Sequence, residues 1–477
     1  MKKHNILKVL FITILAIVLC TWIFPSAQFQ ETLVEGERMQ AGLFDLFAYP
    51  MVVLQYFGSI VLFIATCGIF YGVAYRIPAY HQLVQKITDG FKGMEHIFLA
   101  TVIILISVIV SVTGISVPIL FVFPFIIDVV LKMGYNRLVA ATVTVGPTVA
   151  GIAGTTLGVM TTGYLNQVLE LAVFDEMVSK VVILIIFVIL LIAQVILYGK
   201  KTKNVTIQME EKSTPSKATE IKEKVEVAKK EKTTGKKTTG KKTTSKTNSK
   251  TTNKKSSSKN SKSTGKRGRP PKSSAAMAKD NSETLVIPTK SEKKANIWPF
   301  VIVFDLVLII LALSAFDWNG LFDITWFSEA KEAVLTYEIF DFQIFGKLLG
   351  VVEEFGNWSL GAEMTAIILI ATCVLALVYR VKWEDFIDGI CDGFKKAMGP
   401  AAIILITYVV LVLVTFHPFQ LVFTKFLLDL TSGINVVTMT LVAMLASFFN
   451  IDMSYVVQNT LPYVKTVITD AGLYPLI

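Results

Sequence analysis

Long apolar runs that match the thickness of a lipid bilayer constrain this chain more than any other feature. A membrane-spanning helix needs about 20 predominantly apolar residues. The chain has at least five runs of this kind, including 6–24, 51–74, 97–131 and 181–198. Only 17% of its residues are charged, whereas about a quarter are charged in a typical soluble domain. We therefore predict an all-α polytopic membrane protein, which excludes a soluble enzyme, a fibrous protein and a disulfide scaffold.

One segment differs from the rest of the chain in composition. Residues 200–294 hold 28 of the 46 Lys and Arg residues but only 9 of the 36 Asp and Glu residues, a local net charge of +19, and they contain no aromatic residue. Such a segment cannot bury enough apolar surface to offset the entropy of ordering its backbone. We predict a first transmembrane repeat over 1–199, a disordered Lys-rich cytoplasmic linker over 200–296 and a second transmembrane repeat over 297–477.

The charges around the apolar runs predict the orientation of the chain. Lys2 and Lys3 precede the first run, whereas the segment 25–50 that follows it is acidic. Because basic residues prefer the cytoplasmic side, we expect a multi-pass protein of the cell membrane with a cytoplasmic N-terminus. Two amphipathic stretches on that side, 76–94 and 382–397, both contain the sequence Asp-Gly-Phe-Lys, which hints at an internal duplication.

The run 97–131 is too long for one span and short for two spans joined by a solvated loop. Hydroxyl residues, glycine and proline occupy its middle, Ser111-Val112-Thr113-Gly114-Ile115-Ser116-Val117-Pro118. Irregular backbone at membrane depth is tolerated where it is buried in protein or lines a wet cavity. The pattern favours a re-entrant hairpin whose tip ends inside the protein, and two thin spans joined by a tight turn are the alternative.

Glycine and threonine cluster in the next run, 138–165, between Gly146-Pro147 and Thr162-Gly163. Each glycine weakens a helix by roughly 1 kcal/mol relative to alanine, so the cluster predicts a helix that breaks within the membrane. A broken helix offers free backbone groups at mid-depth, which many transporters use to bind substrates and ions. The pattern also fits close helix packing through small residues, but the clustering of threonine with glycine favours a binding site.

A second polar tip lies between two apolar segments near the end of the chain. Residues 441–449 and 456–467 flank Asn450-Ile451-Asp452-Met453-Ser454-Tyr455. A re-entrant hairpin here would enter from outside, and two opposed hairpins are expected of an inverted repeat. Asp452 is the one carboxylate at depth in this segment, and an ionisable group there indicates function by default. It would hold a proton or Na⁺, or else cap a helix turn at a wet tip.

In their order these elements resemble the YfcC-like proteins of the four-carbon dicarboxylate anaerobic carrier family, in the ion-transporter superfamily. In the first half the similarity includes Trp22-Ile23-Phe24-Pro25, Asp89-Gly90-Phe91-Lys92, Lys132-Met133-Gly134-Tyr135 and Gly154-Thr155-Thr156 through Thr162-Gly163. In the second half it includes Phe448-Phe449 before the tip and Asn459-Thr460-Leu461-Pro462 after it. The resemblance implies a secondary active transporter of a small organic anion, an amino acid or a related metabolite, coupled to a cation (Na⁺ or H⁺) or to exchange. It also implies a homodimer, by analogy with relatives.

Carried over to this chain, the resemblance implies a substrate site shared by both tips and the broken helix. Its residues are Ser111, Thr113, Gly114 and Ser116 in the first tip, Gly151, Gly154, Thr155 and Thr156 in the broken helix, and Asn450 and Ser454 in the second tip, with Asp452 as the ion-coupling residue. The family continues into a second broken helix, whereas this chain stops at Leu476-Ile477, and the second tip here carries no glycine. We therefore expect a second repeat that is incomplete at its C-terminus.

The linker supports a different class of function. Lys266, Arg267, Arg269 and Lys272 surround glycine and proline in a motif similar to an AT-hook, which reads a narrow minor groove of DNA with arginine. Basic tethers also bind anionic lipid, at about 1 kcal/mol per basic residue near the surface, and a solvated low-complexity linker is the third interpretation. The alternative to transport is thus a non-transporting membrane anchor whose basic loop binds nucleic acid or anionic lipid.

The remaining ionisable residues predict neither catalysis nor a resident cofactor or metal. The 4 histidines and 4 cysteines show no metal-ligand spacing, and no nucleophile stands with a base in a catalytic pattern. Asp128 precedes Lys132 by one helical turn, so we expect an ordinary ion pair between them.

Overall fold

A computed structural model describes most of the chain outside the basic linker. The described residues are 3–114, 116–158, 166, 168, 170, 172, 177–213, 295–314, 318–340, 342–349, 352–356, 358, 362–430, 436–446 and 459–470. One compact unit contains Met1–Met209 and Lys293–Ile477. Within the described residues, five helices are long and apolar enough to cross a membrane. The prediction of an all-α polytopic membrane protein is therefore confirmed, with two short β-ribbons added in its loops.

The first half of the chain begins with a long helix, a ribbon and a second long helix. Its elements up to the predicted hairpin are α1 (Lys3–Ile23), β1 (Ala27–Gln30), β2 (Thr32–Glu35), α2 (Leu43–Ala74) and α3 (Pro78–Gly90). β1 and β2 pair antiparallel with Ala27 opposite Glu35, and Glu31 makes the turn between them with a φ of 61°. α3 is the amphipathic helix expected within 76–94, and it begins at a proline, which suits the first turn of a helix.

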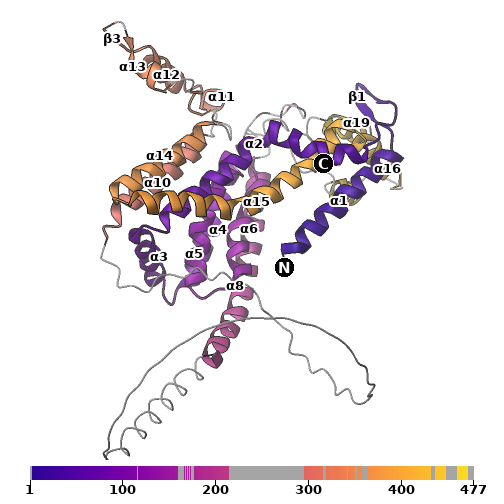
Figure 1. Ribbon diagram of the computed structural model, residues 1–477. Helices are drawn as coiled ribbons and strands as arrows, with labels where there is room; N and C mark the ends of the chain where they lie inside the picture. Colours follow the sequence, from indigo (N-terminus) through magenta and orange to yellow (C-terminus); the bar gives the residue numbers. More distant parts are fainter. Residues whose placement is uncertain are drawn as a thin grey trace, which may run out of the picture. The chain divides into compact units, whose positions relative to one another are not determined.

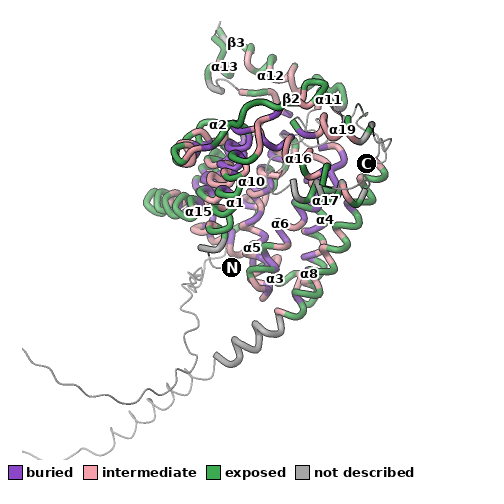
Figure 2. Tube along the Cα trace, turned by 90° about the vertical axis from the view of Figure 1, so that its right-hand side faces the viewer, coloured by how far each residue is buried: buried purple, intermediate pink, exposed green. Residues whose placement is uncertain are grey.

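The predicted hairpin and the broken helix follow as α4 (Glu95–Thr113), the 3₁₀-helix η1 (Pro118–Phe121), α5 (Phe123–Lys132) and α6 (Arg137–Ala153). α4 has 19 residues and is long enough to cross a bilayer. The return through η1 and α5 is shorter, since the 10 residues of α5 rise only about 15 Å. α8 (Met177–Ser213) then leads toward the linker. Most of its residues over Met177–Thr202 are exposed in the protein (Figure 2), as expected of an apolar helix that faces lipid.

The described part of the second half contains several apolar helices and shorter elements between them. They are α10 (Trp298–Ser314), α11 (Trp318–Phe322), α12 (Trp326–Thr336), β3 (Glu338–Ile339), β4 (Phe342–Gln343), α13 (Ile344–Leu349), α14 (Ala362–Val378), α15 (Trp383–Phe416), α16 (Gln420–Leu430), α17 (Val436–Ala446) and α19 (Leu461–Asp470). The amphipathic stretch 382–397 is not a separate surface helix, because α15 continues through it and through Pro400 for 34 residues. In the first half, by contrast, Gly93 with a φ of 87° separates α3 from α4.

The two halves pack together where α2 crosses α15 (Figure 1). Glycines on both helices bring the two backbones into contact at this crossing. A Cβ built on Gly72 would lie 2.1 Å from the carbonyl oxygen of Gly389, and a Cβ built on Gly393 would lie 2.1 Å from that of Gly68. Each helix thus carries two glycines four residues apart, the spacing that allows close helix contact in membranes.

An aromatic cluster extends the contact between the halves to α10. The ring of Phe70 on α2 lies 4.8 Å from that of Phe121 on η1, and Phe121 lies 5.4 Å from Phe304 on α10, measured between ring centroids. All three side chains are buried. The first hairpin is therefore anchored by its return arm to helices of both halves.

A second set of contacts joins the β1–β2 ribbon to the end of α15 and to α16. The backbone N–H of Ala27 donates to the carbonyl of Pro418 at 2.9 Å, and the Tyr49 hydroxyl lies 2.7 Å from Nε2 of His417. Lys425 pairs with Glu35 at 3.2 Å, and this hydrogen bond raises the pKa of the Lys425 ammonium group. The acidic segment after the first span thus packs against the second half.

Candidate functional site

Two apolar helices end at the same place, and both ends have a cause in the sequence. α4 ends at Thr113 because Gly114 adopts left-handed backbone, with a φ of 72°, and donates its N–H to the carbonyl of Val110 at 2.8 Å. α6 ends at Ala153, where Gly154 leaves the helical conformation with a φ of −107° and a ψ of 40°. The helix therefore ends inside the run 138–165, as its glycines predicted.

Ser111 ties the two helix ends together. Its hydroxyl donates to the carbonyl of Gly154 at 2.6 Å, and its own carbonyl accepts the backbone N–H of Thr156 at 2.9 Å. The Thr156 hydroxyl also donates to the Ser111 carbonyl at 3.1 Å and lies 3.2 Å from Ser111 Oγ. Ser111 is fully buried and Thr156 is 6% exposed, so this polar cluster lies inside the protein.

Glycine allows the two segments to approach to backbone contact. A Cβ on Gly158 would lie 2.7 Å from the Cα of Gly114, and a Cβ on Gly151 would lie 2.8 Å from the carbonyl oxygen of Ser107. Cβ atoms essentially never come that close to another heavy atom, so a side chain at either position would push the segments apart. The helix break and close small-residue packing, which the sequence offered as alternatives, therefore occur together.

The electrostatics of the crossing between α4 and α6 follow from the direction of these two helices. Ser107 Oγ donates to the Pro147 carbonyl at 3.2 Å and Ser111 contacts Gly154, so α4 and α6 run in the same direction and end together. Each helix C-terminus carries a partial negative charge of roughly half an electron. The Thr155 hydroxyl donates to two carbonyls of the last turn of α6, those of Gly151 at 3.3 Å and Ile152 at 2.6 Å. Carbonyl and hydroxyl oxygens therefore dominate this site, which favours a cation.

The structure brings six of the eight residues predicted in this part of the chain to the crossing or its edge. They are Ser111, Gly114, Gly151, Gly154, Thr155 and Thr156. Thr113 instead donates its hydroxyl to the carbonyl of Ile109 in its own helix, at 2.6 Å. Ser116 lies in the bend that leads to η1.

The other predicted residues lie outside the described part of the chain. They are Asn450, Asp452 and Ser454 of the second tip and Lys266, Arg267, Arg269 and Lys272 of the linker. The helix after the second tip, α19, is described and approaches the chain that follows the broken helix. Lys465 on α19 donates to the carbonyl of Val168 at 2.9 Å and to Glu170 at 3.0 Å. The segment that follows the broken helix and the helix that follows the second tip are therefore neighbours.

Two polar features near these segments were missed by the sequence analysis. Asn166 is 5% exposed, and its amide nitrogen and oxygen have no hydrogen-bond partner within the described residues. The second feature is a cavity of about 360 Å³ whose polar lining is uncharged: Gln28, Gln30, Thr415, Gln420, Asn459 and Thr460. Asn166 directly follows the predicted broken-helix run and could have been noticed. The cavity could not, because its walls come from three distant parts of the sequence.

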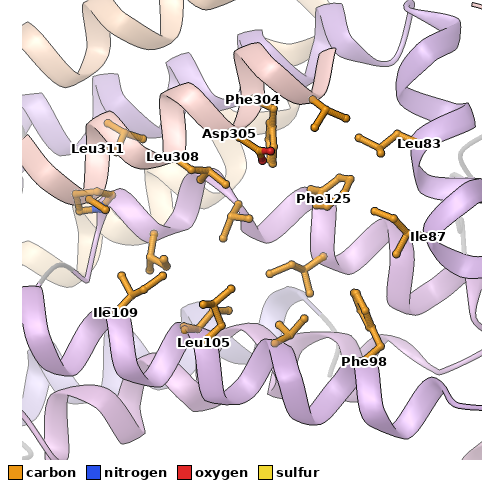
Figure 3. Close-up of a pocket in the computed structure, with 18 residues that line it drawn as sticks. Leu83, Ile87, Phe98, Leu105, Ile109, Phe125, Phe304, Asp305, Leu308 and Leu311 are labelled. Atoms are coloured by element: carbon orange, nitrogen blue, oxygen red, sulfur yellow. The ribbon is translucent and has the colours of Figure 1, made fainter. Parts of the chain in front are cut away.

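Another cavity, of about 380 Å³, lies beside the hairpin and is almost entirely apolar. Figure 3 shows Leu105 and Ile109 of α4 across from Leu308 and Leu311 of α10. Asp305 of α10 is the one carboxylate in this lining. The apolar walls make this cavity unsuitable for a small polar anion.

The carboxylate of Asp128 does not form the ion pair with Lys132 that the helical spacing predicted. Its oxygen Oδ2 instead accepts hydrogen bonds from the hydroxyls of Tyr75 and Tyr80, the first at 2.9 Å. Tyr75 directly follows α2 and Tyr80 lies on α3, so tertiary contacts replace the local pair. No ion pair within 4.0 Å joins Asp128 to Lys132, both of which are described.

Comparison with known proteins gives one finding. A family model described as C4-dicarboxylate anaerobic carrier matches residues 4–242. The matched span contains the hairpin of α4 and α5 and the break at Gly154. No curated protein and no solved structure matches the chain.

Proposed function

This chain belongs to the C4-dicarboxylate anaerobic carrier family, a family of transporters, and on that basis we propose that it is a secondary active transporter of a small organic anion. The family's description makes four-carbon dicarboxylates the first substrates to test, followed by amino acids and related metabolites. Transport would be coupled to a cation or to exchange. The apolar helices support a location in the cell membrane, and the charges flanking the first span support a cytoplasmic N-terminus.

One observation carries the proposal: a helix that ends in the middle of an apolar run, against the tip of a hairpin. There the Ser111 hydroxyl donates to the Gly154 carbonyl, and the Ser111 carbonyl accepts the backbone N–H of Thr156. In this closed arrangement the protein satisfies its own polar groups. We propose that the substrate and its coupling cation replace these bonds when α4 and α6 separate.

The coupling cation would lie at the paired C-termini of α4 and α6. Helix C-termini and unwound carbonyls are the groups that coordinate Na⁺ or H⁺ in many secondary transporters. The negative partial charges of both helix ends favour a cation at this point. The substrate anion would use the hydroxyl and N–H donors of the same crossing, with Asn450, Ser454 and Asp452 of the second tip completing the site. The transporter would work as a homodimer, and its basic linker would lie against anionic lipid.

The test is uptake of radiolabelled succinate, fumarate and aspartate into proteoliposomes that contain the full-length protein, with and without Na⁺ and pH gradients. Alanine at Ser111 should lower the uptake rate about tenfold. It removes one hydroxyl donor to the substrate anion, and a hydrogen bond to a charged group contributes about 1.5–3 kcal/mol, where about 1.4 kcal/mol corresponds to tenfold.

The matched control is Thr142→Ala on α6. Within the described residues the Thr142 hydroxyl bonds to the Leu138 carbonyl of its own helix, at 2.8 Å, and to no other group, so uptake should stay near that of the unaltered protein. If correctly inserted protein accumulates or exchanges none of these substrates, the proposal fails. If Ser111→Ala transports as fast as Thr142→Ala, the site is elsewhere.

A further inference from the structure

A carboxylate on the return arm of the hairpin is held by two tyrosines from two other helices. Asp128 lies on α5, and one of its oxygens, Oδ2, accepts the hydroxyl of Tyr75 at 2.9 Å and the hydroxyl of Tyr80 as well. Tyr75 follows the last residue of α2, and Tyr80 lies in the first turn of α3. The two hydroxyls therefore link three elements through a single oxygen atom.

The charged and titratable groups around this oxygen come from four elements. Tyr71 of α2 gives its hydroxyl to the Phe121 carbonyl at 2.7 Å, and His81 of α3 contacts the Tyr75 carbonyl through Nε2 at 2.9 Å. Lys132 lies on α5 itself, and Lys396 of α15 lies 5.6 Å above the ring of Tyr75. None of these cations forms an ion pair with Asp128. The carboxylate is therefore held by neutral hydroxyl donors inside an aromatic pocket.

Aromatic rings limit the access of water to the cluster. Tyr80 is 1% exposed and Asp128 is partly buried. The rings of Tyr75 and Tyr80 meet edge to face at 5.3 Å between centroids, and Phe300 of α10 packs on Tyr80 at 5.6 Å. Removal from water favours the neutral form of a carboxyl group, whereas hydroxyl donors favour the ionised form. The two effects oppose each other. The balance between neutral and ionised Asp128 therefore depends on whether the hydroxyls of Tyr75 and Tyr80 donate to it.

We propose that Asp128, Tyr75 and Tyr80 form a proton-binding site that controls how firmly the hairpin's return arm is held. Ionised Asp128 accepts two charge-assisted hydrogen bonds, which are about twice as strong as neutral ones. When Asp128 takes up a proton, the oxygen loses its charge and both bonds weaken. α5 is then held less firmly by α2 and α3, and η1 joins α5 to the hairpin tip that contacts the broken helix. The link to uptake rests on the proposed transport function, whereas the proton site itself does not.

The proton site can be tested without any transport. Infrared difference spectra of the full-length protein in liposomes, recorded as the pH is varied, should show a buried carboxylic acid band that disappears in Asp128→Asn. The control is Asp89→Asn on α3, where an exposed carboxylate bonds to Gln85 of its own helix at 2.8 Å, and the band should persist. Persistence of the band in Asp128→Asn, or its absence from the unaltered protein, would overturn the proposal.

A second variant tests the role of the tyrosines. Tyr80→Phe removes one hydrogen-bond donor to the ionised carboxylate of Asp128 while it keeps the aromatic ring. The protonated form of Asp128 is therefore favoured more than in the unaltered protein. The midpoint of the infrared band should move to higher pH by about one to two pH units. An unchanged midpoint would show that the hydroxyl does not control the proton.

Uptake then separates the two proposals. If transport occurs, its rate should depend on pH in the unaltered protein, and the part of that dependence that follows the infrared midpoint of Asp128 should disappear in Asp128→Asn, which cannot ionise. The same pH dependence in both proteins would contradict proton control of the hairpin. If no substrate is transported, only the proposed function fails, and the infrared result still decides the proton site.

Discussion

Valine at Gly72 should leave almost no folded protein, because α2 and α15 could no longer pack. The new Cβ would lie 2.1 Å from the backbone oxygen of Gly389 and 2.7 Å from the Cα of Gly393. Backbone atoms cannot move aside as a flexible side chain can, so the cost should exceed the roughly 1–3 kcal/mol that is typical of overpacked cores. Thermal unfolding and size-exclusion chromatography of the detergent-solubilised protein would measure the loss.

Gly58 provides a control on the same helix. A Cβ at Gly58 meets no atom within 4 Å. Gly58→Val is therefore the same substitution as Gly72→Val, but without a steric clash. It should give a yield and a melting temperature close to those of the unaltered protein. Equal behaviour of the two variants would mean that the α2–α15 crossing does not stabilise the fold.

Valine at Gly151 should abolish uptake while most of the fold persists. Its Cβ would lie 2.7 Å from Cβ of Val110 and 2.8 Å from the Ser107 carbonyl oxygen, which forces α4 away from α6. The bond between Ser111 and Gly154 would break, and the proposed substrate site would lose its geometry. Uptake per inserted molecule should fall to the level of empty liposomes, while the melting temperature falls less than in Gly72→Val.

The control for this variant is Gly90→Val at the end of α3, where a Cβ meets no atom within 4 Å. Its uptake should match that of the unaltered protein. If Gly151→Val transports at the normal rate, close contact between the hairpin and the broken helix is not needed for transport.

Part of the fold could be predicted because the bilayer imposes its own length scale. Apolar runs of the required length predicted the spans of α1, α2 and α8 directly. That a helix breaks within 138–165 could also be predicted, since the conformational freedom of glycine is a property of the residue itself. The ends of elements were less predictable: α2 begins at Leu43 rather than near residue 51, because an apolar run does not show where a helix projects beyond the membrane.

The repeated Asp-Gly-Phe-Lys motif has a different structural role in each half, which its sequence does not predict. In the first half Gly90 of this motif is the last residue of α3, and a Cβ built on it would meet no atom within 4 Å. In the second half the equivalent Gly393 lies inside α15 and touches the backbone of Gly68. The same four residues therefore end a helix in one place and form a helix crossing in the other.

The sequence by itself determined the class of protein, the position of most spans and the presence of a helix break within 138–165. These follow from local properties, namely hydrophobicity over a fixed length and the backbone freedom of glycine. Only the tertiary structure decided that Ser111 bonds to Gly154, that Asp128 bonds to two tyrosines rather than to Lys132, and that α2 crosses α15 through glycine. Each of these contacts joins residues that are far apart in the chain, and a residue's sequence neighbours do not show which distant backbone will lie against it.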